Sequence, residues 1–191
     1  MIVVIAGLYI VFFSNKDSNN NNVSTNPIAI IDTSMGIIKV ELFQDKVPNT
    51  VDNFVNLANG GFYNGLVFHR VANLDKNSPN NHIIQAGGFY PNGTSKASPF
   101  GPINLEINED ARHIDGAIAM ARTDDPNSAT SQFYICDGPQ SFLNDNYAVF
   151  GIVIEGMNVV REIGSVETTT KYGGYENWPI NDVIINSITI D

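Results

Sequence analysis

The chain has 191 residues, which suits one ordinary domain with a short extension, and 43% of them are hydrophobic, as expected for a protein with a packed core. Lys and Arg number 10 against 20 Asp and Glu, so the net charge is −10. Because phosphate binding needs a basic face, this acidic balance argues against nucleic acid as a partner. The single cysteine, Cys136, excludes an internal disulfide, and its setting FYIC indicates an inert thiol buried in a strand.

The N-terminus differs in composition from the rest of the chain. It begins with an unbroken apolar run, IVVIAGLYIVFF, which is shorter than the roughly 20 residues of a membrane span and matches the apolar centre of a secretory signal. We therefore interpret residues 1–13 as a signal or a membrane anchor and the Asn-rich residues 14–27 as a flexible linker. The domain of residues 28–191 is then expected outside the cytoplasm, secreted or tethered to a membrane. If the apolar run is not a targeting segment, the expected location is the cytoplasm.

From residue 28 onward, short β-rich runs separated by turn residues predict about eight strands and two helices. The strands are expected over residues 28–32, 37–43, 66–71, 83–86, 117–121, 132–136, 148–154 and 183–190. The first helix is expected to begin at Pro48 and to end at Asn59-Gly60-Gly61, and the second covers residues 156–163. Strands and helices do not alternate, so we expect a mainly β fold, a closed antiparallel barrel with helices at its ends.

The motif FHRV at residues 68–71 is followed by AMAR and SQFYI, which set one arginine among apolar and amide-bearing segments. No nucleophile, base or metal set accompanies it: Ser131 lacks a nucleophile elbow, and the three histidines lack the spacing of a metal site. We expect neither a metal nor a cofactor. This combination favours a site that binds and twists a substrate without breaking a bond, and proline isomerisation is the leading candidate.

Six segments in order strengthen this interpretation: FHRV, IIQAGG, GAIAMAR, SATSQFYI, SFL and YAVFG. They resemble the signature blocks of the cyclophilins, the cyclophilin-type peptidyl-prolyl cis–trans isomerases, and are most similar to the bacterial periplasmic and archaeal type. The resemblance runs from about residue 28 to residue 191. It implies an eight-stranded antiparallel barrel capped by two helices, and a monomeric enzyme acting on proline-containing peptides and on unfolded or folding proteins.

The resemblance also implies roles for polar residues. Arg70 matches the catalytic arginine of the family, and Gln85 matches a glutamine that binds substrate backbone and helps to orient that arginine. Gln132 matches the glutamine of the SQF block. Ala121 and Arg122 stand where the family presents an Ala-Asn pair whose backbone grips the peptide.

Further substrate-binding positions follow from the same blocks. The proline pocket is expected to be formed by Ile83, Tyr134, Leu143 and Tyr147. His82 stands in the place of a pocket phenylalanine, and Tyr134 in the place of the phenylalanine that faces proline. Phe142 replaces a tryptophan that helps to bind cyclosporin, so weak or no cyclosporin binding is expected.

Two functional hypotheses remain open from the sequence. The first is an active isomerase, favoured by Arg70, Gln85 and Gln132. The second is a chaperone or scaffold module that holds proline-containing segments with little catalysis, because His82 and Tyr134 add polar atoms to a pocket that should be dry. The polar insertion of residues 72–81 could also move His82 out of register.

Overall fold

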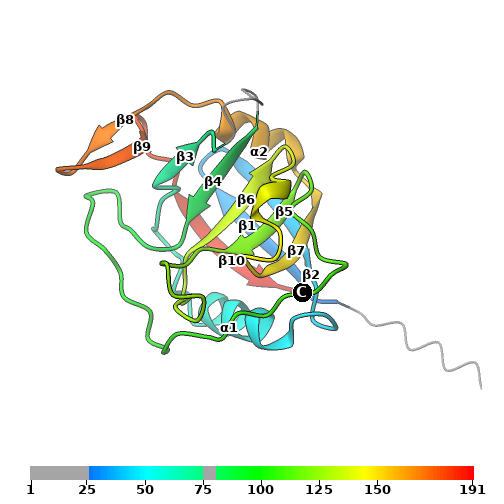
Figure 1. The fold of residues 1–191 in the computed structure, drawn as a ribbon. Coiled ribbons are helices and arrows are strands. Elements are labelled where there is room, and N and C mark those ends of the chain that lie inside the picture. Colours follow the sequence, from blue (N-terminus) through cyan, green and yellow to red (C-terminus); the bar gives the residue numbers. More distant parts are fainter. Residues whose placement is uncertain (1–25, 75–80) are drawn as a thin grey trace, which may run out of the picture.

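The structure is a computed structural model that describes residues 26–74 and 81–191 (Figure 1). The predicted signal or anchor, most of the linker, and residues 75–80 of the polar insertion lie outside the described residues. The elements in chain order are β1 (Ile28–Thr33), β2 (Gly36–Leu42), α1 (Pro48–Asn59), β3 (Arg70–Ala72), β4 (His82–Ala86), β5 (Ala117–Met120), β6 (Phe133–Asp137), the 3-10 helix η1 (Ser141–Leu143), β7 (Val149–Glu155), α2 (Met157–Gly164), β8 (Thr168–Lys171), β9 (Tyr175–Pro179) and β10 (Ile185–Ile190).

Eight strands form one antiparallel sheet in the order β10-β1-β2-β7-β5-β6-β4-β3. The sheet curls until its two ends meet between Val67 and Ile184, which form an isolated bridge. Backbone bonds from Phe68 N to Val183 O (2.9 Å) and from Ile185 N to Leu66 O (2.8 Å) hold this seam. The predicted barrel is therefore confirmed as a curled sheet, but isolated bonds rather than a continuous ladder close it.

Local sequence explains the first hairpin and the first helix. Thr33 and Gly36 pair across the β1–β2 turn, and Gly36 has a φ of 136°, which side-chain-bearing residues rarely adopt. Pro48 is at the start of α1, where its missing N–H costs nothing. The helix ends at Asn59, as predicted, where the Gly61 amide donates to Ala58 O. Figure 1 shows α1 and α2 at opposite ends of the barrel.

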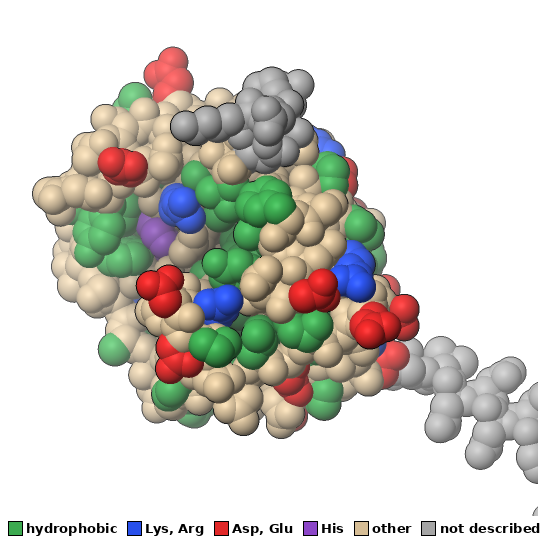
Figure 2. Space-filling model, viewed as in Figure 1, with side chains coloured by type: hydrophobic (Ala, Val, Ile, Leu, Met, Phe, Trp, Pro, Cys, Tyr) green, Lys and Arg blue, Asp and Glu red, His purple; other side chains and the backbone are tan. Residues whose placement is uncertain are grey.

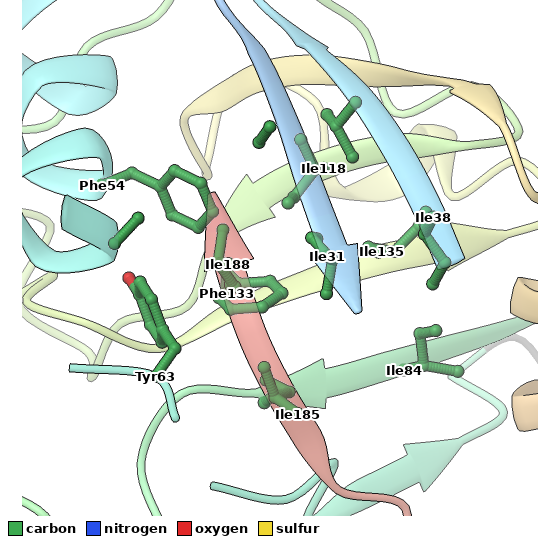
Figure 3. Close-up of a cluster of buried hydrophobic side chains, with 14 of the residues drawn as sticks. Ile31, Ile38, Phe54, Tyr63, Ile84, Ile118, Phe133, Ile135, Ile185 and Ile188 are labelled. Atoms are coloured by element: carbon green, nitrogen blue, oxygen red, sulfur yellow. The ribbon is translucent and has the colours of Figure 1, made fainter. Parts of the chain in front are cut away.

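The inside of the barrel is filled by large apolar side chains from the strands and from α1 (Figure 3). Phe54 of α1 packs into this core, with its ring 5.1 Å from that of Phe150 and 5.5 Å from that of Phe133. Side chains alternate along β6, so Phe133 and Ile135 face this core while Tyr134 and Cys136 face outward. Burial raises the pKa of Cys136 to about 12, in agreement with the predicted inert thiol.

The outward side chains of β4, β5 and β6 form a second apolar cluster with Val149 of β7. Every residue of β5 and β6 is buried, so both faces of these two strands are covered. This outer cluster, rather than the barrel interior, is the surface on which the pocket described below lies.

Two features differ from the sequence-based expectation. The strand expected over residues 66–71 is only β3, because residues 66–69 run along the seam without a ladder. The hairpin β8–β9 was not predicted, because Thr168–Lys171 is polar and largely exposed. The hairpin is anchored by Trp178, which is fully buried against Phe89.

Within the described residues, no helix is long and apolar enough to cross a membrane.

Candidate active site

Strand alternation places the candidate residues on the outer face of the barrel. Along β4, Ile84 and Ala86 face the core, so Ile83 and Gln85 face outward. Antiparallel pairing sets Gln85 opposite both Arg70 of β3 and Tyr134 of β6. Figure 2 shows hydrophobic side chains gathered around a hollow on this face, with basic side chains at its rim.

The hollow contains a cavity of about 130 Å³. Its lining joins residues from the β3–β4 hairpin, the β5 and β6 strands and the η1 region: Arg70, Leu74, Ile83, Gln85, Ala121, Arg122, Tyr134, Leu143 and Tyr147. Apolar cavities of about 150 Å³ accept a benzene ring, so this one has room for a ring of proline size. The four positions predicted for the proline pocket, Ile83, Tyr134, Leu143 and Tyr147, are all in this lining.

A row of three polar side chains runs from the rim of the pocket, at Arg70 and Gln85, to Gln132, which lines an adjoining hollow. Arg70 Nη1 donates to Gln85 Oε1 at 3.3 Å, and Gln85 Nε2 donates to Gln132 Oε1 at 2.9 Å. Gln85 therefore fixes one edge of the guanidinium and is itself fixed by Gln132. The remaining donors of Arg70 can point toward a bound group, since a guanidinium carries five N–H donors in a rigid fork.

Arg122 also lines the pocket, and its side chain is held by several contacts. Its guanidinium carbon lies 4.6 Å from the centre of the Tyr147 ring, and Nε donates to Asn146 O at 2.9 Å. The Ala121 amide already donates to Gln132 O at 2.9 Å. A peptide on this rim would therefore meet the carbonyl of Ala121 rather than its amide.

His82 and Phe142 are not part of the pocket lining. His82 is the first residue of β4 and lies on the same side of the strand as Ile84, so its ring turns toward Asp137, with Nδ1 at 3.8 Å from Oδ2. Phe142 lies next to Leu143 on η1 but is 54% exposed. Conversely, Leu74 lines the pocket although it was not predicted. The signal was available, because Leu74 is the one large apolar residue in the polar segment ANLDKNSPNN.

Tyr134 does not leave a polar atom without a partner, as the sequence suggested it would. Its hydroxyl oxygen lies 2.8 Å from Nε2 of His113, a buried residue behind the pocket. The pocket wall therefore presents the Tyr134 ring, and the hydroxyl is satisfied from behind.

The arrangement offers no group suited to acid–base or nucleophilic chemistry. His69, next to Arg70, is buried against Phe89 with ring centres 4.7 Å apart, and burial lowers its pKa to about 4, so it is neutral near pH 7. Ser131 is buried and donates to Gly87 O. In the part of the chain that the structure describes, no three His, Cys, Asp or Glu side chains are grouped to hold a metal ion.

Two further hollows adjoin the pocket. One, of about 170 Å³, shares Gln85, Ala121 and Arg122 with it and extends to Thr123 and Ser128. The other, of about 300 Å³, shares Arg70 and is bordered by the β8–β9 hairpin at residues 174–177. A chain segment with one residue in the central pocket thus has space on both sides.

Comparison with known proteins identifies the family of the chain. The family described as cyclophilin type peptidyl-prolyl cis-trans isomerase matches residues 28–190. A peptidyl-prolyl cis-trans isomerase of Acinetobacter baylyi is 41% identical over 170 residues, covering 86% of each chain. Peptidyl-prolyl cis-trans isomerase B of Escherichia coli is 40% identical over 166 residues, covering 83% of this chain and 96% of that one.

A solved structure has the same fold. It is a cyclophilin type peptidyl-prolyl cis-trans isomerase of Cryptosporidium parvum, crystallised in the presence of the dipeptide ala-pro. The TM-score is 0.70 at 28% sequence identity, and the match covers 86% of this chain and 98% of the other. With the family match, two relatives at 40% identity or more, and a rim arginine over a pocket of proline size, the chain belongs to the cyclophilin-type peptidyl-prolyl cis–trans isomerases.

Proposed function

We propose that this chain accelerates rotation about X–Pro bonds in peptides and folding proteins, with the Arg70 pocket as its active site. One observation carries the proposal: a guanidinium held by Gln85 lies at the rim of a small pocket lined by Ile83, Tyr134, Leu143 and Tyr147. Uncatalysed X–Pro rotation takes tens to hundreds of seconds and can be the rate-limiting step of folding, so an enzyme that accelerates it shortens the folding time.

The chemistry follows from the electronic structure of the amide. Rotation passes over a barrier of about 18–20 kcal/mol because the twisted bond loses its resonance. In the twisted state, the prolyl nitrogen becomes pyramidal and gains a lone pair that can accept a hydrogen bond. A donor fixed near that nitrogen stabilises the twisted state more than either planar state, which is the condition for catalysis. Arg70 has this role, and the apolar pocket holds the ring while the acyl side turns.

Proline-containing peptides are the proposed substrates. The Cryptosporidium parvum relative was crystallised in the presence of the dipeptide ala-pro, which supports proline-peptide binding by a protein of this fold. Arg122 and the carbonyl of Ala121 are proposed to contact the peptide backbone beside the proline. No bond is made or broken, so neither metal nor cofactor enters the scheme.

The alternative, a binding module with little catalysis, is not favoured. It rested on two polar substitutions in the pocket, but the Tyr134 hydroxyl is partnered by His113 and His82 lies outside the lining. The row from Arg70 through Gln85 to Gln132 is intact.

A peptide assay and a refolding assay together test the proposal. The chain is added to a short Ala-Pro peptide whose isomerisation is followed directly, and to a protein whose refolding is limited by a proline step. Acceleration of both is expected. Peptide binding without acceleration of either reaction would support the binding-module alternative instead.

The expectations about location and assembly are further proposals. We propose that residues 1–13 direct the domain out of the cytoplasm and that it acts there as a monomer, either secreted or membrane-anchored. Fractionation of cells that express the full chain or a version starting at residue 28 tests whether residues 1–13 direct the domain out of the cytoplasm. Equal cytoplasmic recovery of both versions would contradict it.

A further inference from the structure

Three rings lie together behind and beside the pocket. Tyr134 and Tyr147 line it, with ring centres 6.0 Å apart in an edge arrangement. His113 does not line it: it is 1% exposed and lies behind Tyr134, with its ring nearly parallel to that of Tyr134 and the centres 6.0 Å apart. His113 is therefore too deep to touch a substrate, and any effect it has on the pocket acts through other residues.

Hydrogen bonds fix the tautomer of His113. Its backbone N–H donates to Asn144 Oδ1 at 2.9 Å, which identifies that atom as the amide oxygen. The ring Nδ1 lies 3.0 Å from the same oxygen. An amide oxygen only accepts, so Nδ1 carries the proton and the other ring nitrogen of the neutral imidazole, Nε2, is an acceptor. The Tyr134 hydroxyl, 2.8 Å from Nε2, therefore donates to it.

The charge states agree with this assignment. Burial lowers the pKa of His113, against weaker opposing effects of Asn144 and Asp145, so the ring is neutral near pH 7. Burial also raises the pKa of Tyr134 well above its usual value, so the hydroxyl keeps its proton. Each polar atom of the pair consequently has a partner of the opposite kind.

We propose that His113 is a positioning residue of the proline pocket, which holds Tyr134 through Nε2 and Asn144 through Nδ1. Asn144 directly follows η1, whose last residue, Leu143, lines the pocket. One imidazole thus connects the floor of the pocket, Tyr134 on β6, with the wall next to Leu143. It also keeps the Tyr134 hydroxyl turned away from the ring that the pocket receives.

The physical reason is that His113 and Tyr134 depend on each other. If His113 is replaced by an apolar residue, the Tyr134 hydroxyl is left buried without a partner, and it can be satisfied only by moving toward the pocket or by admitting water. If Tyr134 becomes phenylalanine alone, Nε2 of His113 loses its donor. If both are apolar, neither polar atom remains, so the pocket can again be dry.

A double-mutant cycle tests the proposal, which rests on the proposed function because its readout includes isomerisation. The wild type, His113→Leu, Tyr134→Phe and the double variant are compared for Ala-Pro peptide affinity by NMR titration and for kcat/KM. His113→Leu is expected to weaken both about ten-fold, roughly the effect of one unsatisfied buried hydroxyl. The double variant is expected to recover most of this loss. Failure of the second substitution to rescue the first would overturn the proposal.

A second measurement uses the unmodified chain and does not depend on whether a variant folds. The nitrogen chemical shifts of His113 near pH 7 report which ring nitrogen carries the proton, and Nδ1–H with a bare Nε2 is expected. The opposite tautomer, or a charged ring, would refute the assignment. If the wild type is inactive, the proposed function fails, yet the peptide affinities and the tautomer still decide this proposal. If the wild type is active but His113→Leu binds normally, only this proposal fails.

Discussion

Replacing Gln85 by leucine tests whether the orientation of Arg70 matters for catalysis. Leucine has a similar size but removes the oxygen that accepts from Arg70 Nη1 and the nitrogen that donates to Gln132. The Arg70–Gln85 bond is 3.3 Å long, longer than the roughly 2.9 Å of a typical N–H···O bond. We therefore assign it a value near the low end for bonds to charged groups, about 1.5 kcal/mol, which corresponds to about a ten-fold change.

The loss is expected in kcat. Arg70 meets the prolyl nitrogen only in the twisted state, so a misdirected guanidinium weakens transition-state stabilisation and leaves ground-state binding nearly unchanged. The assay follows isomerisation of an Ala-Pro peptide at low temperature, where the uncatalysed reaction takes minutes. Equal melting temperatures of variant and wild type exclude a folding defect.

Gln132→Leu is the matched comparison for this experiment. It removes the second bond of the row but leaves the Arg70–Gln85 bond in place, so its effect on kcat is expected to be smaller than that of Gln85→Leu. A Gln85→Leu enzyme with wild-type kcat and a raised KM would refute the orienting role and assign Gln85 to substrate binding alone.

Two further predictions concern stability and inhibition. Glu106 caps α1 from a distant loop, since its carboxylate accepts hydrogen bonds from the Thr50 amide at 2.6 Å and from the Asn49 side chain at 2.6 Å. The Glu106→Ala substitution is expected to lower the free energy of unfolding by about 1–2 kcal/mol and Tm by about 2–8 °C. Glu109→Ala, at an exposed position nearby, is the control. Burial raises the pKa of Glu106, but the bonds to Thr50 and Asn49 outweigh this effect and hold the pKa below its usual value. The stabilisation by Glu106 is therefore present near neutral pH, and the difference in unfolding free energy between variant and wild type should shrink as pH falls. A difference that grows in acid would contradict the assignment. Phe142→Trp is expected to raise the affinity for cyclosporin, because Phe142 is exposed beside the pocket and lacks the indole N–H donor of tryptophan. Unchanged cyclosporin affinity in a titration would show that another residue limits binding.

The barrel could be predicted because its signals are local. Short β-rich runs between turn residues predict most of the strands, and Pro48 with the glycines after Asn59 predicts the bounds of α1. The hairpin β8–β9 could not be predicted, because its strands are polar and it is held by the packing of Trp178 against Phe89, which is distant in the sequence. Leu66, Val67 and Phe68 predict a strand because they are apolar, but burial at the seam explains that composition equally well.

The candidate site was predictable where it depends on strand alternation. Ile83 and Gln85 share a face of one strand, so both point outward if either does. The same alternation turns His82 away from the pocket, because His82 lies on the same side of β4 as Ile84. The position of His82 could therefore have been predicted once the register of β4 was known. The contact between His113 and Tyr134 joins residues 21 positions apart, and nothing in the local sequence of either indicates the other. That contact reverses the concern that Tyr134 spoils the pocket.

The central claim is that Arg70 makes this chain an isomerase, and kcat for Ala-Pro peptide isomerisation by the wild type, Arg70→Lys and Arg70→Ala tests it most directly. Removal of one fixed donor to a transition state costs about 10²–10³ in kcat, so Arg70→Ala is expected to fall that far. Arg70→Lys should recover little, because an ammonium keeps the charge without the fork that Gln85 holds. An Arg70→Ala protein with wild-type kcat would contradict the account, since catalysis would then come from another part of the molecule.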